Sequence, residues 1–162
     1  YDGNGRTGRI LNLLHLVLHG LLDLPVLYLS RYIVRHKSDY YRGLQAVRDE
    51  EAWEAWVLYM LRAVEETSQE TLAKVRGIRE LMQSTKQRLR TELPKLYSQD
   101  LLNNLFRHPY TKIEFIERDL GVSRPTATKY LAALEQGGLV RKTKLGRTNF
   151  YVNEPLFELL SQ

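Results

Sequence analysis

The first nine residues carry the densest group of side chains in this sequence that suits phosphate binding. Residues 2–9 read Asp-Gly-Asn-Gly-Arg-Thr-Gly-Arg, and a largely apolar segment follows at 10–22. Glycines let a backbone approach a ligand closely, and the first turn of a helix presents unpaired N–H groups. Arg6 and Arg9 are three residues apart, so on a helix they lie near one another. We therefore expect an anion site where the apolar helix begins.

Asp2 adds a carboxylate to this group, and a carboxylate can hold Mg²⁺ against phosphate oxygens. An acid, an amide-rich turn and two arginines together suit a nucleoside triphosphate. On the residues alone, an ordinary turn explains the segment at least as well, because Asp-Gly and Asn-Gly are common turn dipeptides. The segment is neither a Walker A loop, which requires Gly-Lys-Ser/Thr, nor a dinucleotide-binding fingerprint.

Residues 2–9 resemble the signature of the Fic family, which reads His-Pro-Phe-x-Asp/Glu-Gly-Asn-Gly-Arg-x-x-Arg. Eight consecutive residues fit, and the chain through about residue 67 fits too, including Ser30-Arg31-Tyr32 and Asp39-Tyr40-Tyr41. The resemblance implies a protein adenylyltransferase, which transfers AMP from ATP to a Ser, Thr or Tyr hydroxyl of a target protein. Gly5 favours AMP transfer, because the phosphotransferase branch of the family carries Lys at that position.

The resemblance also implies a role for each signature residue. Asp2 would coordinate Mg²⁺ between the α- and β-phosphates of ATP. Arg9 would hold the γ-phosphate, or pair with an inhibitory glutamate when the enzyme is off. The remaining signature residues would bind the phosphates as well: Gly3, Asn4, Gly5 and Arg6. Cofactors implied by the family are therefore ATP and Mg²⁺.

Two tyrosines further along the chain, Tyr40 and Tyr41, match positions that lie beside the adenine in related proteins. Those proteins often carry Asn one or two helical turns later, where Arg48 stands here. The catalytic His of the signature would stand three residues before Tyr1, so no catalytic residue is expected in this chain. We therefore expect these residues alone to be an inactive fragment, and the intact parent to transfer AMP.

From Ser98 onward the sequence predicts three short helices and a β-hairpin. The helices are expected at 98–107 and 112–119, and from Ser123 to the Gly137-Gly138 pair. Strand-like segments at 139–143 and 149–152 flank a turn at 144–147 that contains Gly. Residues 113–152 resemble a winged helix-turn-helix domain in this order of elements.

Basic residues gather between Ser123 and Thr148, where six Lys or Arg stand against one acid, Glu135. In winged helices the third helix enters the major groove of DNA and the hairpin touches phosphate. The residues that would face DNA by this resemblance are Ser123, Arg124, Thr126, Thr128, Lys129, Lys144 and Arg147. Winged helices also dock proteins or form homodimers, and both alternatives stay open.

Together these observations predict a mainly α protein. The C-terminal helices of a Fic-type all-α domain occupy residues 1–67, a helical connector 68–97 and the winged-helix domain 98–162. The clearest helix has an apolar face at Trp53, Trp56, Val57, Met60, Leu61 and Val64. The segment from 68 onward predicts one or two further helices that end near Pro94.

Composition limits the other classes of function. The chain has no cysteine, which excludes disulfides and thiolate metal sites. The apolar segment at 10–22 is shorter than the roughly 20 residues that a membrane-spanning helix needs, so no membrane partner is expected. The chain starts with Tyr and has no basic and apolar leader. We therefore expect a processed chain or fragment that is cytoplasmic.

Overall fold

The computed structural model describes residues 4–161. The chain divides into two compact units, Tyr1–Ala73 and Lys74–Gln162. The protein is mainly helical with one small antiparallel sheet, so the predicted fold class is confirmed. No helix within the described residues is long and apolar enough to cross a membrane. The division into a Fic part, a connector and a winged helix stays a prediction.

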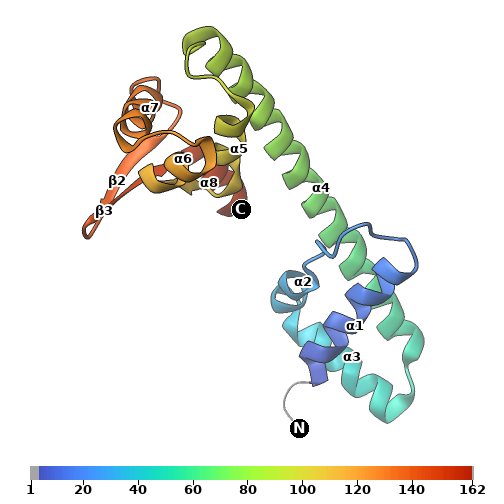
Figure 1. Cartoon of the computed structure of the whole chain (residues 1–162). Helices are drawn as coiled ribbons and strands as arrows, with labels where there is room; N and C mark the ends of the chain where they lie inside the picture. Colours follow the sequence, from blue (N-terminus) through green and yellow to red (C-terminus); the bar gives the residue numbers. More distant parts are fainter. Residues whose placement is uncertain (1–3, 162) are drawn as a thin grey trace. The chain divides into compact units, whose positions relative to one another are not determined.

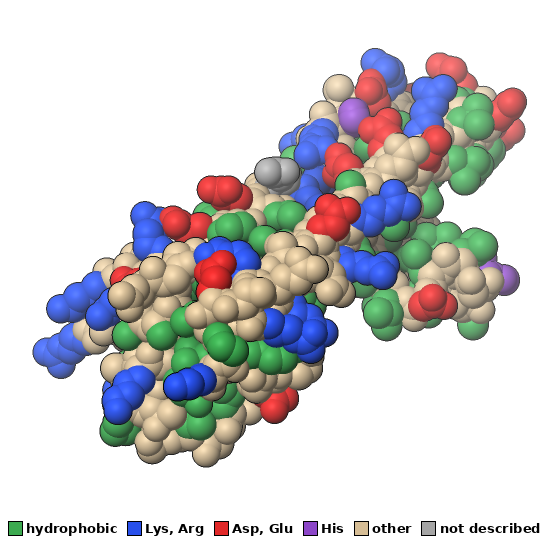
Figure 2. All heavy atoms as spheres, turned by 90° about the horizontal axis from the view of Figure 1, so that it is seen from above, with side chains coloured by type: hydrophobic (Ala, Val, Ile, Leu, Met, Phe, Trp, Pro, Cys, Tyr) green, Lys and Arg blue, Asp and Glu red, His purple; other side chains and the backbone are tan. Residues whose placement is uncertain are grey.

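The first unit consists of α1 (Asn4–Leu18), α2 (Leu29–Arg35), α3 (Lys37–Glu50) and the first part of α4 (Trp53–Glu92), all drawn in Figure 1. Its buried core is small, with Leu27, Leu29 and Ala63 at the centre. Many large apolar side chains of this unit are exposed, among them Ile10, Leu11, Leu14, Leu18, Trp53, Val57 and Leu61. Figure 2 shows hydrophobic side chains at the surface among charged ones.

Helix α4 is a single helix of 40 residues, where the sequence suggested an amphipathic helix followed by one or two more. The unit boundary lies within it, after Ala73. Gly77 is the one helix-breaking residue type in its interior, and a single Gly costs a helix only about 1 kcal/mol. The helix contains no proline, and Pro94 follows its end, where the next turn begins. Nothing in the sequence of α4 therefore interrupts it.

The second unit adds α5 (Gln99–Arg107), β1 (Tyr110–Thr111), α6 (Ile113–Leu120), α7 (Arg124–Gln136), β2 (Arg141–Leu145), β3 (Thr148–Val152) and α8 (Glu154–Ser161) to the end of α4. Its core buries Leu89, Leu101, Leu102, Ile116, Leu131, Leu134 and Tyr151. The three predicted helices begin and end within about a residue of α5, α6 and α7. Strand β1 and helix α8 were not anticipated.

The hairpin differs from the sequence expectation by two residues. Leu139 and Val140 are buried before the strand begins, and β2 continues to Leu145. The turn then holds only Gly146 and Arg147, because Leu145 pairs with Thr148. Gly146 has φ +59°, which the first position of a two-residue type II′ turn requires. The strand order is β1-β3-β2, so β2 lies at an edge.

A polar network joins α5, β1 and α6. The Thr111 hydroxyl donates to Oδ1 of Asn104 over 2.6 Å, and Nδ2 of Asn104 donates to Oδ2 of Asp119 over 2.8 Å. Arg107 and Arg118 also donate to the Asp119 carboxylate, over 3.0 and 2.7 Å. Each buried polar atom of this network thus has a partner, as the stability of a buried polar group demands.

Candidate phosphate site

Helix α1 begins at Asn4, so Asn4 to Arg9 form its first turns. The helix has no acidic residue in its first turn. The positive end of the helix dipole lies at this first turn, beside Asn4 and Gly5, where it favours an anion. Asp2 and Gly3, expected to bind the metal and the phosphates, lie outside the described residues.

Gly5 lies against two of the other predicted site residues. A Cβ placed on Gly5 would lie 3.4 Å from Nη1 of Arg9 and 3.8 Å from the hydroxyl of Tyr40. Arg9 is one helical turn along α1, whereas Tyr40 comes from α3. The fold thus brings a guanidinium and a phenol hydroxyl close to Gly5, which has no side chain.

A hollow of about 310 Å³ lies beside these residues. Arg6 and Arg9 line it from α1, and Ser30 lines it from α2. The rest of its lining is mostly apolar: Ile10, Leu13, Leu27, Tyr28 and Leu29. Two cations in the lining of a mostly apolar hollow suit a ligand that has a charged end and an apolar or aromatic end.

The two tyrosines expected near adenine lie in different surroundings. The Tyr40 ring makes edge contacts with Trp56 and Tyr41, at centroid distances of 5.3 and 5.5 Å. Tyr41 is 59% exposed, and Nζ of Lys37 lies 6.0 Å from its ring centroid. Tyr40 is therefore held in place by packing, while Tyr41 offers an exposed ring face for stacking.

Tyr40 packs against an aromatic cluster that contains Trp56, Tyr59 and Tyr32. The sequence indicated only a core position for Trp56. Trp56 stacks on Tyr59 at 5.7 Å, and Tyr59 meets Tyr32 edge-on at 5.6 Å. Burial, followed by the neighbouring Tyr32, raises the pKa of Tyr59 to about 12. The Tyr59 hydroxyl donates to the carbonyl of His36 over 3.4 Å. The cluster is thus a neutral, rigid support.

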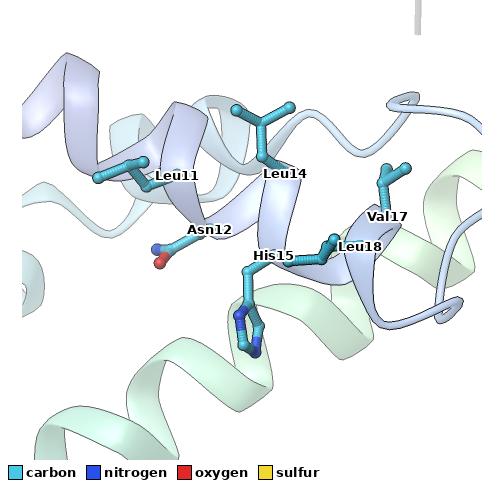
Figure 3. A pocket seen from close by; sticks show the side chains of 6 residues that line it. All are labelled: Leu11, Asn12, Leu14, His15, Val17 and Leu18. Atoms are coloured by element: carbon cyan, nitrogen blue, oxygen red, sulfur yellow. The ribbon is translucent and has the colours of Figure 1, made fainter.

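No group of three or more His, Asp or Glu side chains within residues 4–161 is arranged to hold a metal ion. The rings of His15 and His19 lie 4.3 Å apart on α1 without such a third ligand. Figure 3 shows the neighbouring hollow, in which Leu14 and His15 point to opposite sides of α1. Its lining is mainly apolar and includes neither arginine of the phosphate site: Leu11, Asn12, Leu14, His15, Val17 and Leu18.

The residues predicted to face DNA lie at the start of α7 and on the hairpin. All of them are exposed except Thr126, which is half-buried. Ser123 takes the N-cap position of α7, but its hydroxyl lies 3.0 Å from Oγ1 of Thr126 and caps no backbone N–H. Nη1 of Arg124 lies 3.6 Å from a carboxylate oxygen of Glu117.

A polar hollow of about 210 Å³ lies between α6, α7 and the hairpin. It brings together two of the predicted cations, Arg124 and Arg147. Sequence reasoning missed its other polar members, which come from the start of α6 and from β3: Lys112, Glu114, Thr148 and Asn149. Lys112 takes the N-cap position of α6, although the sequence predicted it as the first residue of that helix.

The second unit also matches a known family. Residues 81–156 match the family described as protein adenylyltransferase SoFic-like, C-terminal domain. This match supports a Fic-family C-terminal part in the second unit. The matched residues run from the last turns of α4 into α8, so they include the whole sheet and α5 to α7. The signature-like residues 2–9 precede the matched segment, and the Fic resemblance noted there agrees with it.

Proposed function

We propose that this chain supplies the phosphate-binding residues of a protein adenylyltransferase, which transfers AMP from ATP to a Ser, Thr or Tyr hydroxyl of a target protein. One observation carries the proposal: Arg9 and the Tyr40 hydroxyl converge on Gly5 in the first turn of α1. The family of the second unit supports it independently. The substrates are then ATP and a second protein.

Arg6 and Arg9 hold the β- and γ-phosphates in this proposal, and the N–H groups of Asn4 and Gly5 hold phosphate oxygens. Binding at these oxygens fixes the triphosphate so that the α-phosphorus faces the incoming hydroxyl. The hydroxyl oxygen forms a bond to the α-phosphorus, and the bond from that phosphorus to the bridging oxygen of pyrophosphate breaks. Positive charge at the pyrophosphate end stabilises the leaving group.

Mg²⁺ would neutralise phosphate charge in this site. Among residues 4–161, the start of α1 offers arginines and amides, which fit phosphate oxygens and do not fit a cation. Asp2 and the phosphates themselves are therefore the proposed ligands. The proton of the target hydroxyl needs a base, a role that the family signature assigns to its His. This chain's own histidines stand at other positions: His15, His19, His36 and His108.

Calorimetric titration of the chain with ATP and Mg²⁺ tests the proposal. We expect binding that weakens about tenfold or more in Arg9→Ala, because charged hydrogen bonds contribute about 1.5–3 kcal/mol. Arg79→Ala is the matched control, since it removes the same charge from the exposed surface of α4 in the second unit. Equal affinity of the two variants, or no binding of ATP by the unaltered chain, would refute the phosphate site.

DNA binding through the second unit is a second candidate. The observation that favours it is the hollow where Arg124, Arg147 and Lys112 meet, beside the exposed Thr128 and Lys129. Binding to mixed-sequence duplex DNA should be strongest at low salt and should fall steeply as salt rises. The pair Arg124→Ala and Lys129→Ala should abolish it. DNA that stays unbound at low salt would exclude this function.

A homodimer formed through the second unit remains the third candidate. Sedimentation of the chain over a range of concentrations tests it directly. A mass that rises with concentration would favour a dimer, and a constant monomer mass would exclude one.

A further inference from the structure

The second unit has a further groove, whose lining includes none of the predicted DNA-facing residues of α7. It measures about 620 Å³ and lies between one face of the sheet and α8. Its floor is formed by alternate residues of the three strands, and its wall by Phe157, which is 54% exposed. The floor residues are largely apolar: Tyr110, Thr143, Leu145, Phe150 and Val152.

The floor of the groove ends at β2, the edge strand of the sheet. Strand β2 pairs only with β3, and its residues make no other backbone hydrogen bond within the described part of the chain. In a hairpin closed by the pair Leu145 and Thr148, hydrogen-bonded pairs alternate along the ladder. The N–H and C=O groups of Lys142 and Lys144 therefore point away from β3. An extended chain can pair with them.

At β2, the two faces of the sheet favour partner residues of different charge. Successive side chains of a strand alternate between faces, so Lys142 and Lys144 lie on the face opposite the groove. Both are exposed. On the groove face, Arg141 is already paired with Glu154, whose carboxylate oxygen lies 2.6 Å from Nε of Arg141. Glu158 lines the same wall. An acidic residue is thus favoured opposite the lysines and disfavoured in the groove.

These charges also select against the simplest occupant, a second copy of the chain. Pairing of two β2 edges would bring Arg141, Lys142 and Lys144 of each copy against a strand of the same charge. Like charges opposed across strands are destabilising, and lysines on an edge strand commonly prevent self-association. An acidic strand reverses this effect, so the lysines that exclude one partner select another.

We propose that the β2 edge and the groove beside it bind an extended acidic segment of a partner protein in which apolar and acidic residues alternate. The segment adds a fourth strand to the sheet. Its apolar side chains enter the groove beside Leu145, Phe150 and Phe157, and its carboxylates lie against Lys142 and Lys144. This docking surface is separate from the phosphate site, so its test does not depend on ATP binding.

A labelled peptide of about eight residues with alternating Val and Glu tests the proposal, since this length spans the five residues of β2. Fluorescence polarisation with the full chain should show binding, and the amides of Lys142 and Lys144 should exchange with solvent more slowly. A peptide of the same composition, with the Val and Glu residues in separate blocks, should bind at least tenfold more weakly.

Two variants separate the contributions of the groove and the edge. Phe157→Ala should weaken binding severalfold. Because the Phe157 side chain is 54% exposed, the substitution should leave the fold intact. The double variant Lys142→Glu and Lys144→Glu should lose the acidic peptide and gain a peptide with Lys in place of Glu. The double variant Lys95→Glu and Lys129→Glu changes the charge of the same unit by the same amount at exposed residues that do not line the groove, so it is the control and should bind normally.

Three outcomes would overturn the proposal. Equal binding of the alternating and the block peptide would show that charge attraction alone holds the peptide. Slowed exchange of the two lysine amides on adding duplex DNA, without any effect of the peptide, would assign the edge to nucleic acid. Slowed exchange of these amides as the chain concentration rises would assign it to a second copy.

Discussion

The hydroxyl of Tyr40 on α3 lies 3.8 Å from the point where a Cβ on Gly5 of α1 would stand. Nη1 of Arg9 lies 3.4 Å from the same point. A glycine at this position leaves room for a ligand atom between the guanidinium and the phenol. The first turn of α1, Arg9 and Tyr40 therefore act as one unit in the proposed site.

Gly5→Ala should separate the fold from the binding function. Its methyl group would make ordinary van der Waals contacts with Arg9 and Tyr40, so helix content and thermal midpoint should stay close to those of the unaltered chain. The methyl group would take up space that phosphate oxygens need, and we expect the affinity for ATP and Mg²⁺ to fall about tenfold, or about 1.4 kcal/mol. Titration calorimetry measures this change.

Gly8→Ala is the control for that experiment. It makes the same substitution in the same helix, at a position where a Cβ would meet nothing within 4 Å. Its affinity should equal that of the unaltered chain. A loss of the same size in both variants would place the effect in the helix and not in the site.

Gly43→Ala should destabilise the first unit. A Cβ there would lie 2.9 Å from Cε3 of Trp56, and an indole ring held in a cluster of tyrosines cannot move aside easily. Overpacking of this kind costs about 1–3 kcal/mol. Both tryptophans of the chain, Trp53 and Trp56, lie in this unit, so urea unfolding followed by tryptophan fluorescence reports on it selectively.

The double variant Gly43→Ala with Trp56→Leu should recover part of that loss relative to Trp56→Leu alone. The remaining Trp53 then reports the transition. Strict additivity of the two substitutions would mean that the contact with the indole ring does not cause the destabilisation.

Tyr59 should make the first unit sensitive to alkali. Burial is the main cause of its pKa of about 12, which lies above the ordinary value of 10.0. Because the pKa is higher in the folded state, the contribution to stability is complete below about pH 10 and is lost as the pH rises towards 12. Tyr59→Phe cannot ionise, so its free energy of unfolding should decline less over this range.

Urea unfolding at several pH values, followed by tryptophan fluorescence, measures the effect of Tyr59. Tyr28→Phe is the matched control, since Tyr28 is 64% exposed in the same unit. It should leave the decline unchanged. Parallel curves for Tyr59→Phe and the unaltered chain would show that Tyr59 does not cause the alkaline sensitivity.

Asp119→Asn should weaken the second unit and make it less sensitive to acid. Hydrogen bonds from Arg118 first, and from Asn104 next, hold the pKa of Asp119 below its ordinary value, although burial opposes this shift. The stabilisation is therefore present above about pH 4 and is lost as the pH falls through the lowered pKa. At neutral pH the substitution should cost about 1–3 kcal/mol.

Urea unfolding followed by circular dichroism at neutral and acidic pH measures this difference. Glu135→Gln makes the same change of carboxylate to amide at an exposed position of α7, and it should alter neither value appreciably. If Asp119→Asn and Glu135→Gln behave alike, the network around Asp119 does not stabilise the fold.

Local sequence patterns predicted much of the second unit correctly. Ser98 takes the N-cap position of α5 and accepts a hydrogen bond from the backbone N–H of Leu101 over 3.0 Å. Gly146 supplies the positive φ of the hairpin turn. These features depend on the backbone preferences of a few consecutive residues, so a single sequence is enough to reveal them.

The sequence also determined the chemistry of the candidate phosphate site, because the residue types at 2–9 decide which ligand they can hold. Tertiary structure decided what lies opposite them. Tyr40 reaches Gly5 across the gap between α3 and α1, and β1 pairs with β3 across the intervening α6 and α7. Likewise, only the folded sheet and α8 together form the groove beside β2. Such contacts join segments far apart in the chain and depend on how whole elements pack, which local preferences do not encode.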